Sequence, residues 1–194
     1  MARPRSEDKR NAILDAAIAE FASRGAWSTP TSAISRAAGV AEGTLFTYFA
    51  NKEVLVNELY RQLKTELADV MLADWPEEAD PKTKYRHIWD RYVYWGVDNP
   101  EKFKVMSQLK VSDQVSDESK AAGMAPFLRL EVLATECIRN RLIRDQPLPF
   151  LGAMLGAMAE TTMVFVAQAK TRKGRAGYCE AGFETFWRGI VAAA

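Results

Sequence analysis

The sequence predicts an all-α fold of about nine helices, divided into a small N-terminal helical domain and a larger C-terminal one. Apolar residues recur at intervals of three and four along most of the chain, which is the spacing of helices that bury one face. No segment alternates polar and apolar residues for long, so strands are not expected. With 48% apolar residues in a length of 194, the chain can bury a substantial core.

The first helix is expected over residues 7–24. Ser6 precedes two acidic residues, and acidic side chains are favourable beside the positive N-terminal end of a helix. Gly25 supplies the permissive backbone that commonly ends a helix. The apolar face of this helix is expected to comprise Ile13, Leu14, Ala17, Ile18 and Phe21.

Two short helices are expected next, over about 30–38 and about 42–48. Thr29 is expected to be the N-cap of the first, with Pro30 at its first position, where proline lacks only an N–H that has no partner anyway. Gly39 is expected to close this helix and to permit a sharp turn into the second. The buried residues of the first are expected to be Ile34, Ala37 and Ala38.

The later helices are expected from longer apolar patterns. Asn51 is expected to cap a helix with leucine at every fourth position, which places the leucines on one face. Pro126 lies near the start of a helix that is expected to reach about residue 144, so a kink or a late start is expected there. The leucines are Leu55, Leu59, Leu63 and Leu67, and the other helices are expected over about 82–97, a short stretch after 100, about 149–170 and about 178–192.

The two short helices and the turn at Gly39 form a helix–turn–helix. Val40, Leu45 and Phe49 are expected to point inward, which uses one side of the second helix. The opposite side is expected to fit the major groove of DNA, because glycine lets the backbone approach closely and hydroxyl groups bond to phosphates or base edges. That side carries Gly43, Thr44, Thr47 and Tyr48.

Three further residues are expected to assist DNA binding. Lys52 is placed to pair with a phosphate, and Thr29 and Thr31 present hydroxyl groups near a helix N-terminus. The whole chain has a net charge of +1, but residues 1–52 carry seven lysines and arginines against five acidic residues. Arg3 and Arg5 belong to this basic N-terminal arm. Helix–turn–helix shapes also occur in proteins that never bind DNA, so the turn alone leaves that alternative open.

The stretch TPTSAISRAAGVAEGTLFTYFANKEVL, residues 29–55, resembles the DNA-binding domain of the TetR/AcrR family of bacterial repressors. The match covers about residues 6–60, and shorter matches such as MARPRSEDKR and AETTM resemble RamR-type multidrug-efflux regulators. The resemblance implies a homodimer whose recognition helix lies over 42–48. It also implies that DNA is contacted by Gly43, Thr44, Thr47, Tyr48 and Lys52.

Two residues depart from the family pattern that this resemblance brings. Ala41 stands where the family often has serine, so a helix cap is missing. Phe46 stands where the family often has a tyrosine that bonds to phosphate. Because phenylalanine cannot donate that bond, Phe46 is expected to pack or to touch a thymine methyl group.

Residues 1–52 are expected to bind the operator, and residues 53–194 to bind an effector and to dimerise. The resemblance implies an aromatic-lined cavity for a flat or amphipathic effector in the second domain. Core packing is the alternative for each candidate. Glu160 would attract a cation if it faced the cavity, although an exposed edge is the favoured position. The ligand-binding candidates are Tyr60, Trp89, Tyr92, Leu155 and Phe165.

The expected helix over 149–170 has a face of small residues, which lets two helices approach closely. This favours a homodimer in which it and the last helix, 178–192, pack against their copies. Close packing within one subunit is the alternative. The stretch 148–169 is also long enough to span a membrane, but Glu160 and Gln168 interrupt it, so an interface helix is favoured. The small residues are Gly152, Ala153, Gly156 and Ala157.

Enzymes and metalloproteins are disfavoured by the same sequence. His87 is the sole histidine and Cys137 has no recognisable base partner, so no catalytic group is expected. Metal-ligand spacings and phosphate-binding glycine loops are missing, and no cofactor is expected. An all-α enzyme stays a remote alternative. Two isolated cysteines and a polar N-terminus without an apolar leader favour the cytoplasm.

Together these features predict a cytoplasmic transcriptional repressor that binds a palindromic operator as a homodimer. A small hydrophobic or amphipathic effector is expected to release it. The main alternative is a DNA-binding protein that responds to no ligand.

Overall fold

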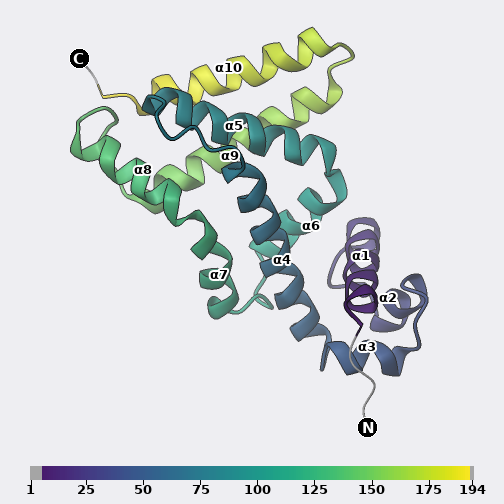
Figure 1. The fold of residues 1–194 in the computed structure, drawn as a ribbon. Coiled ribbons are helices and arrows are strands. Elements are labelled where there is room, and N and C mark those ends of the chain that lie inside the picture. The colour runs from purple at the N-terminus through teal and green to yellow at the C-terminus, as the bar shows by residue number, and fades with distance from the viewer. Residues whose placement is uncertain (1–5, 193–194) are drawn as a thin grey trace. The chain divides into compact units, whose positions relative to one another are not determined.

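The computed structural model describes residues 6–192 and confirms the all-α prediction (Figure 1). Across these residues the only β-pairing is an isolated antiparallel bridge between Ile143 and Val191. Arg3 and Arg5 of the basic arm lie outside the described residues. The helices are α1 (Glu7–Arg24), α2 (Thr31–Ala37), α3 (Glu42–Tyr48), α4 (Lys52–Leu72), α5 (Pro81–Asp98), α6 (Pro100–Lys110), α7 (Asp117–Met124), the 3₁₀ helix η1 (Ala125–Phe127), α8 (Leu128–Arg139), α9 (Leu148–Gln168) and α10 (Arg172–Ile190).

The chain folds into two compact units that do not follow the order of the sequence. The first comprises the residues up to Thr65 together with Pro100–Met124, and the second comprises Glu66–Asn99 with Ala125–Ala194. The division therefore falls inside α4. Helices α6 and α7 belong to the same unit as the helix–turn–helix.

In the first unit, α1 packs on α2 and α6, and α2 packs on α3. The helix bounds confirm the expected start of α1 after Ser6 and its end at Gly25, whose φ is 86°. All five predicted apolar residues of α1 are buried, as are the predicted leucines of α4. Because these positions repeat every three or four residues, the spacing of apolar residues alone predicts the buried face of each helix.

The start of α2 differs from the prediction. Pro30 is its N-cap, and the Thr29 hydroxyl donates instead to the backbone carbonyl oxygens of Gly25 (2.9 Å) and Glu20 (3.3 Å). Thr29 thus holds the turn after α1. Ile34 is buried as expected, whereas Ala37 is exposed.

The long helix expected to reach residue 144 is broken into α7, η1 and α8. Pro126 lies in η1, where its missing N–H and its ring prevent α7 from continuing. Helix α8 ends at Arg139, and Arg141 has a positive φ of 56°, which no helix accommodates. The last helix begins at Arg172 rather than 178, because the Thr171 hydroxyl accepts from the N–H of Gly174 and caps it.

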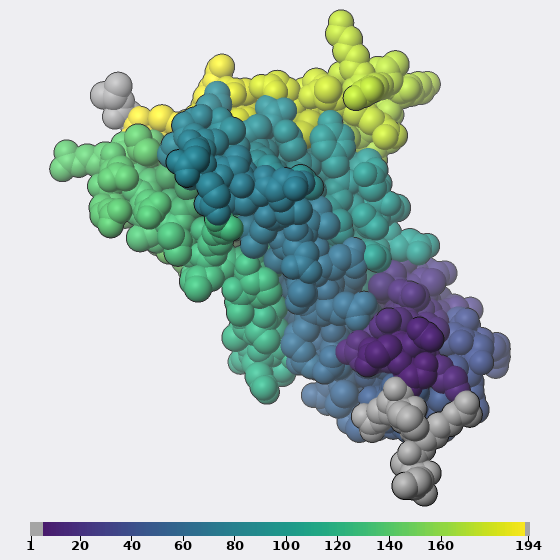
Figure 2. Space-filling model, in the orientation of Figure 1, coloured from purple at the N-terminus to yellow at the C-terminus, as the bar shows by residue number. Residues whose placement is uncertain are grey.

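The second unit is organised by α5, α9 and α10. Helix α10 lies along one side of this unit, against α9 and α5 (Figures 1 and 2). Trp89 is fully buried, stacks on Phe186 with 5.7 Å between ring centroids, and donates its indole N–H to the carbonyl oxygen of Cys179 at 3.1 Å. The aromatic residues of α5 and α10 therefore form the core of this unit.

Both cysteines are expected to be unreactive in the folded protein. They are free and buried, and burial raises the pKa of Cys137 and raises that of Cys179 to about 12. Since the thiolate is the nucleophile, little of it exists below that pKa. The native protein should not react with Ellman's reagent at pH 8, and both thiols should react after denaturation. Rapid reaction of either thiol in the native protein would contradict this.

Candidate nucleic-acid interface

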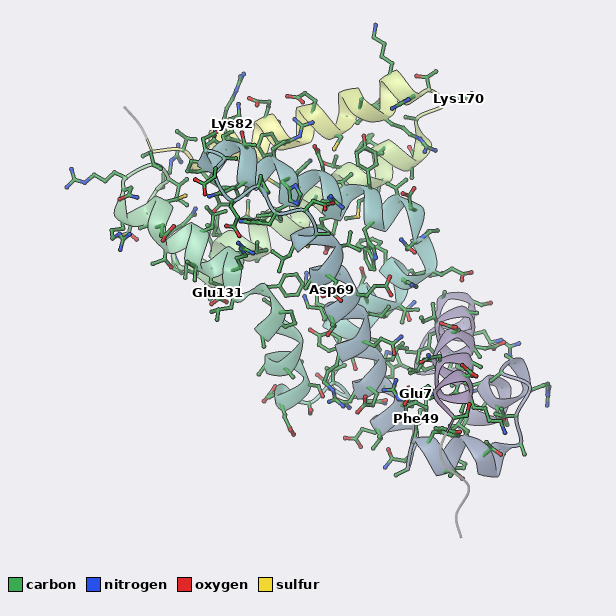
Figure 3. All side chains as sticks on the ribbon, in the orientation of Figure 1. Glu7, Phe49, Asp69, Lys82, Glu131 and Lys170 are labelled. Atoms are coloured by element: carbon green, nitrogen blue, oxygen red, sulfur yellow. The ribbon has the colours of Figure 1, made fainter. Side chains whose placement is uncertain are left out.

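Helix α3 has one buried side and one open side. Leu45 is fully buried, and Phe49, which follows the helix and is labelled in Figure 3, is 1% exposed. The guanidinium of Arg10 lies 5.8 Å from the centre of the Phe49 ring. These contacts anchor the inner side of α3 to the first unit.

The open side of α3 consists of three pairs of residues four positions apart, which are neighbours on a helix. We name them the outer row (Glu42 and Phe46), the central row (Gly43 and Thr47) and the hydroxyl row (Thr44 and Tyr48). The outer and central rows are exposed, and the hydroxyl row is half-buried. The structure thus brings four of the predicted DNA contacts together on one surface.

The central row gives close access to the backbone. A Cβ atom built on Gly43 would meet no atom within 4 Å, so open space lies above this residue. Thr47 donates its hydroxyl to the carbonyl oxygen of Gly43 at 3.0 Å and keeps its lone pairs available. Gly39 has a φ of 66°, which confirms that the turn between α2 and α3 uses the left-handed region.

Tyr48 is fixed by the start of α1. Its hydroxyl oxygen accepts from the backbone N–H of Ser6 at 2.9 Å. The hydroxyl hydrogen remains free to donate, which is the direction that a phosphate oxygen requires.

Lys52 is already bonded within the protein. Its ammonium group donates to the carbonyl oxygens of Thr29 (2.6 Å) and Trp27 (3.1 Å) and lies 5.8 Å from the centre of the Phe21 ring. Burial lowers the pKa of this amine. One of the three ammonium donors stays free, so Lys52 supports the turn before α2 and keeps a single donor for a phosphate.

The two threonines before α3 have separate roles. Thr29 is 1% exposed, so its side chain does not reach the surface. Thr31 is half-buried, and its hydroxyl donates to the Glu42 carboxylate at 2.9 Å. This bond links the starts of α2 and α3 and holds Glu42 in place.

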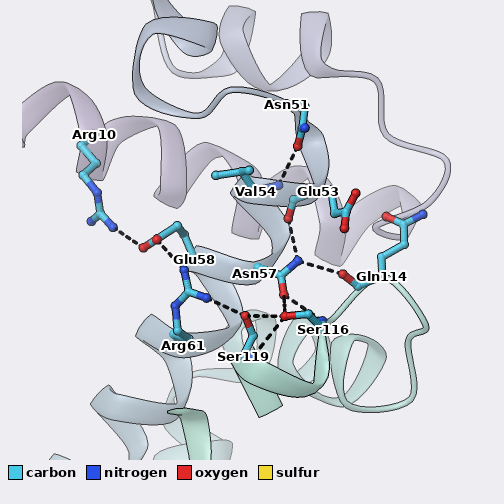
Figure 4. Close-up of polar contacts among 10 residues, drawn as sticks. All are labelled: Arg10, Asn51, Glu53, Val54, Asn57, Glu58, Arg61, Gln114, Ser116 and Ser119. Atoms are coloured by element: carbon cyan, nitrogen blue, oxygen red, sulfur yellow. Dashed lines mark hydrogen bonds and ion pairs between the residues drawn. The ribbon is translucent and has the colours of Figure 1, made fainter. Parts of the chain in front are cut away.

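A polar network that the sequence did not suggest joins α4 to α1 and to the loop before α7 (Figure 4). Asn57 is 8% exposed and donates to the carbonyl oxygens of Glu53 and Gln114, while its own oxygen accepts from the N–H of Ser116. Asn57 is thereby bonded on both sides of its amide. Residues 57 and 116 are too far apart in sequence for any local pattern to indicate this pairing.

A second chain of contacts in Figure 4 runs from α1 across α4. Arg10 pairs with Glu58 at 2.9 Å, Glu58 pairs with Arg61, and Arg61 donates to the Ser119 hydroxyl. The charged side chains of Arg10, Glu58 and Arg61 are partly exposed, so each ion pair contributes little to stability. Ser119, at the end of the chain of contacts, is buried. Their effect is to fix the direction in which α4 leaves the helix–turn–helix.

Replacing Asn57 with alanine should lower the free energy of unfolding by about 1–3 kcal/mol, because the change removes the two hydrogen bonds that the buried Asn57 side chain makes to the backbone of Ser116 and Gln114. Urea denaturation followed by circular dichroism measures this. Gln62→Ala, one turn further along α4 at a half-buried position, is the control. An equal loss in both variants would contradict the assigned role of Asn57.

The structure does not gather the five predicted ligand-binding residues into one pocket. Tyr60 is 5% exposed and belongs to the first unit, while the other four belong to the second. Trp89 is part of the aromatic core, and Leu155 is half-buried on α9. Phe165 is 48% exposed and contacts Tyr178 of α10.

Tyr92 and Glu160 form a polar pair between α5 and α9. The Tyr92 hydroxyl, on a side chain that is 6% exposed, donates to the Glu160 carboxylate at 3.2 Å. Burial and the nearby carboxylate raise the pKa of Tyr92. Glu160 is half-buried and bonded to this phenol, so it does not lie at the exposed edge that the sequence favoured.

Two grooves lie on the second unit. One, of about 540 Å³, is formed by α4 and α5 and includes His87, Asp90 and Arg91. The other, of about 390 Å³, runs between α9 and α10 and includes Phe165, Tyr178 and Thr185. Of the predicted ligand-binding residues, only Phe165 lines either of these grooves.

Helix α9 leaves much of its apolar surface uncovered. Over Leu148–Gln168 it is long and apolar enough to cross a membrane, and 28% of its most apolar window is buried within the chain. Its exposed large side chains are Phe150, Met154, Val164 and Phe165. Contiguous exposed apolar surface of this kind commonly marks a site of interaction.

Comparison with known proteins finds regulators similar to the N-terminal part of this chain. Residues 13–59 match the family model described as bacterial regulatory proteins, tetR family. The chain is 36% identical over 72 residues to the fatty acid metabolism regulator protein of Bacillus subtilis, a match that covers 37% of each chain. It is 42% identical over 53 residues to the HTH-type transcriptional repressor KstR2 of Mycobacterium tuberculosis, which covers 27% of this chain and 26% of that one. The matched part thus spans about a third or less of these relatives' length.

Solved structures extend the likeness to nearly the whole chain. A TetR-family transcription regulator from Shewanella sp. PV-4 is similar with a TM-score of 0.87 and 25% identity, over 97% of this chain and 100% of that one. A regulator of the same family from Marinobacter aquaeolei VT8 has a TM-score of 0.86 and 22% identity, over 96% and 97% of the two chains. The second match concerns the fold alone.

Proposed function

We propose that this chain is a transcriptional regulator of the TetR family and has no enzymatic role. It binds a near-palindromic operator as a homodimeric repressor, and a small amphipathic or hydrophobic effector releases it. The single observation that supports it most is the open side of α3, where Gly43 has free space above its backbone beside Thr47. Such a surface suits close approach to base edges.

The proposed DNA contacts divide by chemistry. Gly43 and Thr47 approach the bases, while Thr44 and Tyr48 donate to phosphates on one side. Lys52 uses its remaining donor on a phosphate, and Thr31 acts through Glu42. Thr29 is assigned to support of the turn and not to contact, because it is buried.

The proposed dimer forms through α9 and α10, the helices that the sequence predicts over about 149–170 and 178–192. The small residues of α9, of which Gly152, Ala153 and Ala157 are exposed, permit close approach of a second copy. The apolar side chains that α9 exposes supply the driving force. A two-fold dimer presents two copies of α3, so half-sites should lie one helical turn, about 34–36 Å, apart.

The proposed control uses α4 as the moving element. Residues 1–52 bind DNA, residues 53–194 bind the effector and dimerise, and α4 begins at Lys52, directly after α3. An effector that shifts α4 changes the spacing of the two copies of α3, so both cannot enter successive major grooves. We keep Tyr60, Trp89, Tyr92, Leu155 and Phe165 as effector contacts, with Tyr92 first, because Glu160 gives it a polar partner.

Selection of a random DNA duplex library by the purified protein tests the DNA-binding part. The expected result is a near-palindromic consensus bound by two subunits. Recovery of unrelated sequences, with an affinity that depends on salt concentration and not on sequence, would contradict specific operator binding.

A regulator that responds to no ligand is the second candidate function. Trp89 favours it, because this side chain is fully buried and its indole N–H is already bonded within the protein. A thermal-shift panel of hydrophobic cations, bile-acid-like compounds and fatty acids distinguishes the two. The matched relatives do not single out RamR-type efflux regulators, so that narrower role stays a proposal. The proposed location is the cytoplasm.

A further inference from the structure

Phe46 is the exposed aromatic residue of the recognition helix. Its side chain is 43% exposed, and it shares the outer row of α3 with Glu42. Single exposed apolar residues are common on protein surfaces, so exposure alone carries no function. The evidence for a function of Phe46 is its position beside the central row, which consists of Gly43 and Thr47.

The chemistry of the outer row suits a position over the bases better than one beside the phosphate backbone. Glu42 carries a carboxylate whose position is fixed by the Thr31 hydroxyl at 2.9 Å. A fixed carboxylate is repelled by phosphates, whereas it can accept from the amino group of a cytosine. The hydroxyl row, on the opposite edge of the open side, has the donors that phosphates need. This difference favours an orientation of α3 in the groove with the outer row over the bases and the hydroxyl row beside phosphates.

We propose that Phe46 contacts the 5-methyl group of one thymine in each half-site, an inference that rests on the proposed DNA binding. The phenyl ring has no hydrogen-bonding group, so it cannot read the polar atoms of a base edge. The thymine methyl is the apolar group that the major groove presents. Phe46 therefore determines specificity at a position that hydroxyl contacts cannot read.

Replacement of single thymines by uracil removes only the methyl group and tests this contact. The probe is the duplex selected from the random library, with binding measured by fluorescence anisotropy. In each half-site, changing one particular thymine to uracil should weaken wild-type binding roughly fourfold. That factor corresponds to the free energy of burying one methyl group. In Phe46→Ala the same change should have no effect.

Two further variants act as controls. Phe46→Tyr keeps the ring, so changing the contacted thymine to uracil should still weaken its binding fourfold. Thr47→Ala should show the same fourfold loss at that thymine. Because Phe46 is exposed, none of its variants should unfold, which circular dichroism verifies. If every thymine penalty persists in Phe46→Ala, the inference is overturned while operator binding stands. If the wild type selects no sequence at all, the proposed function itself fails and the inference with it.

Discussion

Leucine in place of Gly43 is expected to abolish specific operator binding without harming the fold. The added side chain enters open space, since a Cβ on Gly43 meets nothing within 4 Å, and Gly43 lies within helical backbone. Leucine also favours a helix over glycine, by about 0.5–1 kcal/mol. On DNA the same side chain holds the backbone of α3 away from the bases. Operator affinity should fall about a thousandfold, to the level of non-specific binding.

The measurement is fluorescence anisotropy together with thermal unfolding of the same samples. Ala121→Leu adds a side chain of similar size at an exposed position of α7 in the same unit and should change neither quantity. Unchanged operator affinity in Gly43→Leu would show that α3 does not contact the DNA closely. A large loss of stability would mean that the space above Gly43 is occupied.

Aspartate in place of Phe165 is expected to give a folded monomer that no longer holds the operator. Phe165 is 48% exposed in the isolated chain, so a charge there can stay hydrated. Within the proposed dimer it would be buried on α9 without a partner, which opposes association. A monomer carries one copy of α3, so it loses the gain from linking two half-sites, and affinity should fall about a hundredfold or more.

Sedimentation analysis gives the oligomeric state, and anisotropy gives the affinity. Val111→Asp is the matched control, because Val111 is 81% exposed and belongs to the first unit. It should remain dimeric and bind DNA. A dimeric Phe165→Asp protein would exclude this part of α9 from the interface.

Local sequence signals predicted the parts of this protein that depend on local structure. The apolar repeats of α1 and α4 identified their buried sides, and Gly25 and Gly39 marked turns that the structure confirms. The open side of α3 followed from the same periodicity. Such features depend on residues within one or two helical turns, so one sequence contains the information.

Features that depend on long-range contacts were not predictable. Lys52 was expected to face DNA, yet most of its donors bond to carbonyl oxygens 23 and 25 residues away. Glu160 meets Tyr92 across 68 residues. The position of the effector site was the hardest feature to predict, because aromatic residues both fill protein cores and line cavities. Trp89 illustrates this, since its ring is entirely enclosed by the packing of the second unit.

Fluorescence anisotropy of the purified protein on DNA from upstream of its own gene measures whether α3 reads a specific operator. Scrambled DNA of equal length is measured beside it at physiological salt. We expect tight binding to the upstream DNA with two subunits per site and weak binding to the scrambled DNA. In Gly43→Leu this difference in affinity should be lost. Equal, weak binding to both DNAs that falls steeply with salt, together with no selected consensus from the random library, would contradict specific reading by α3.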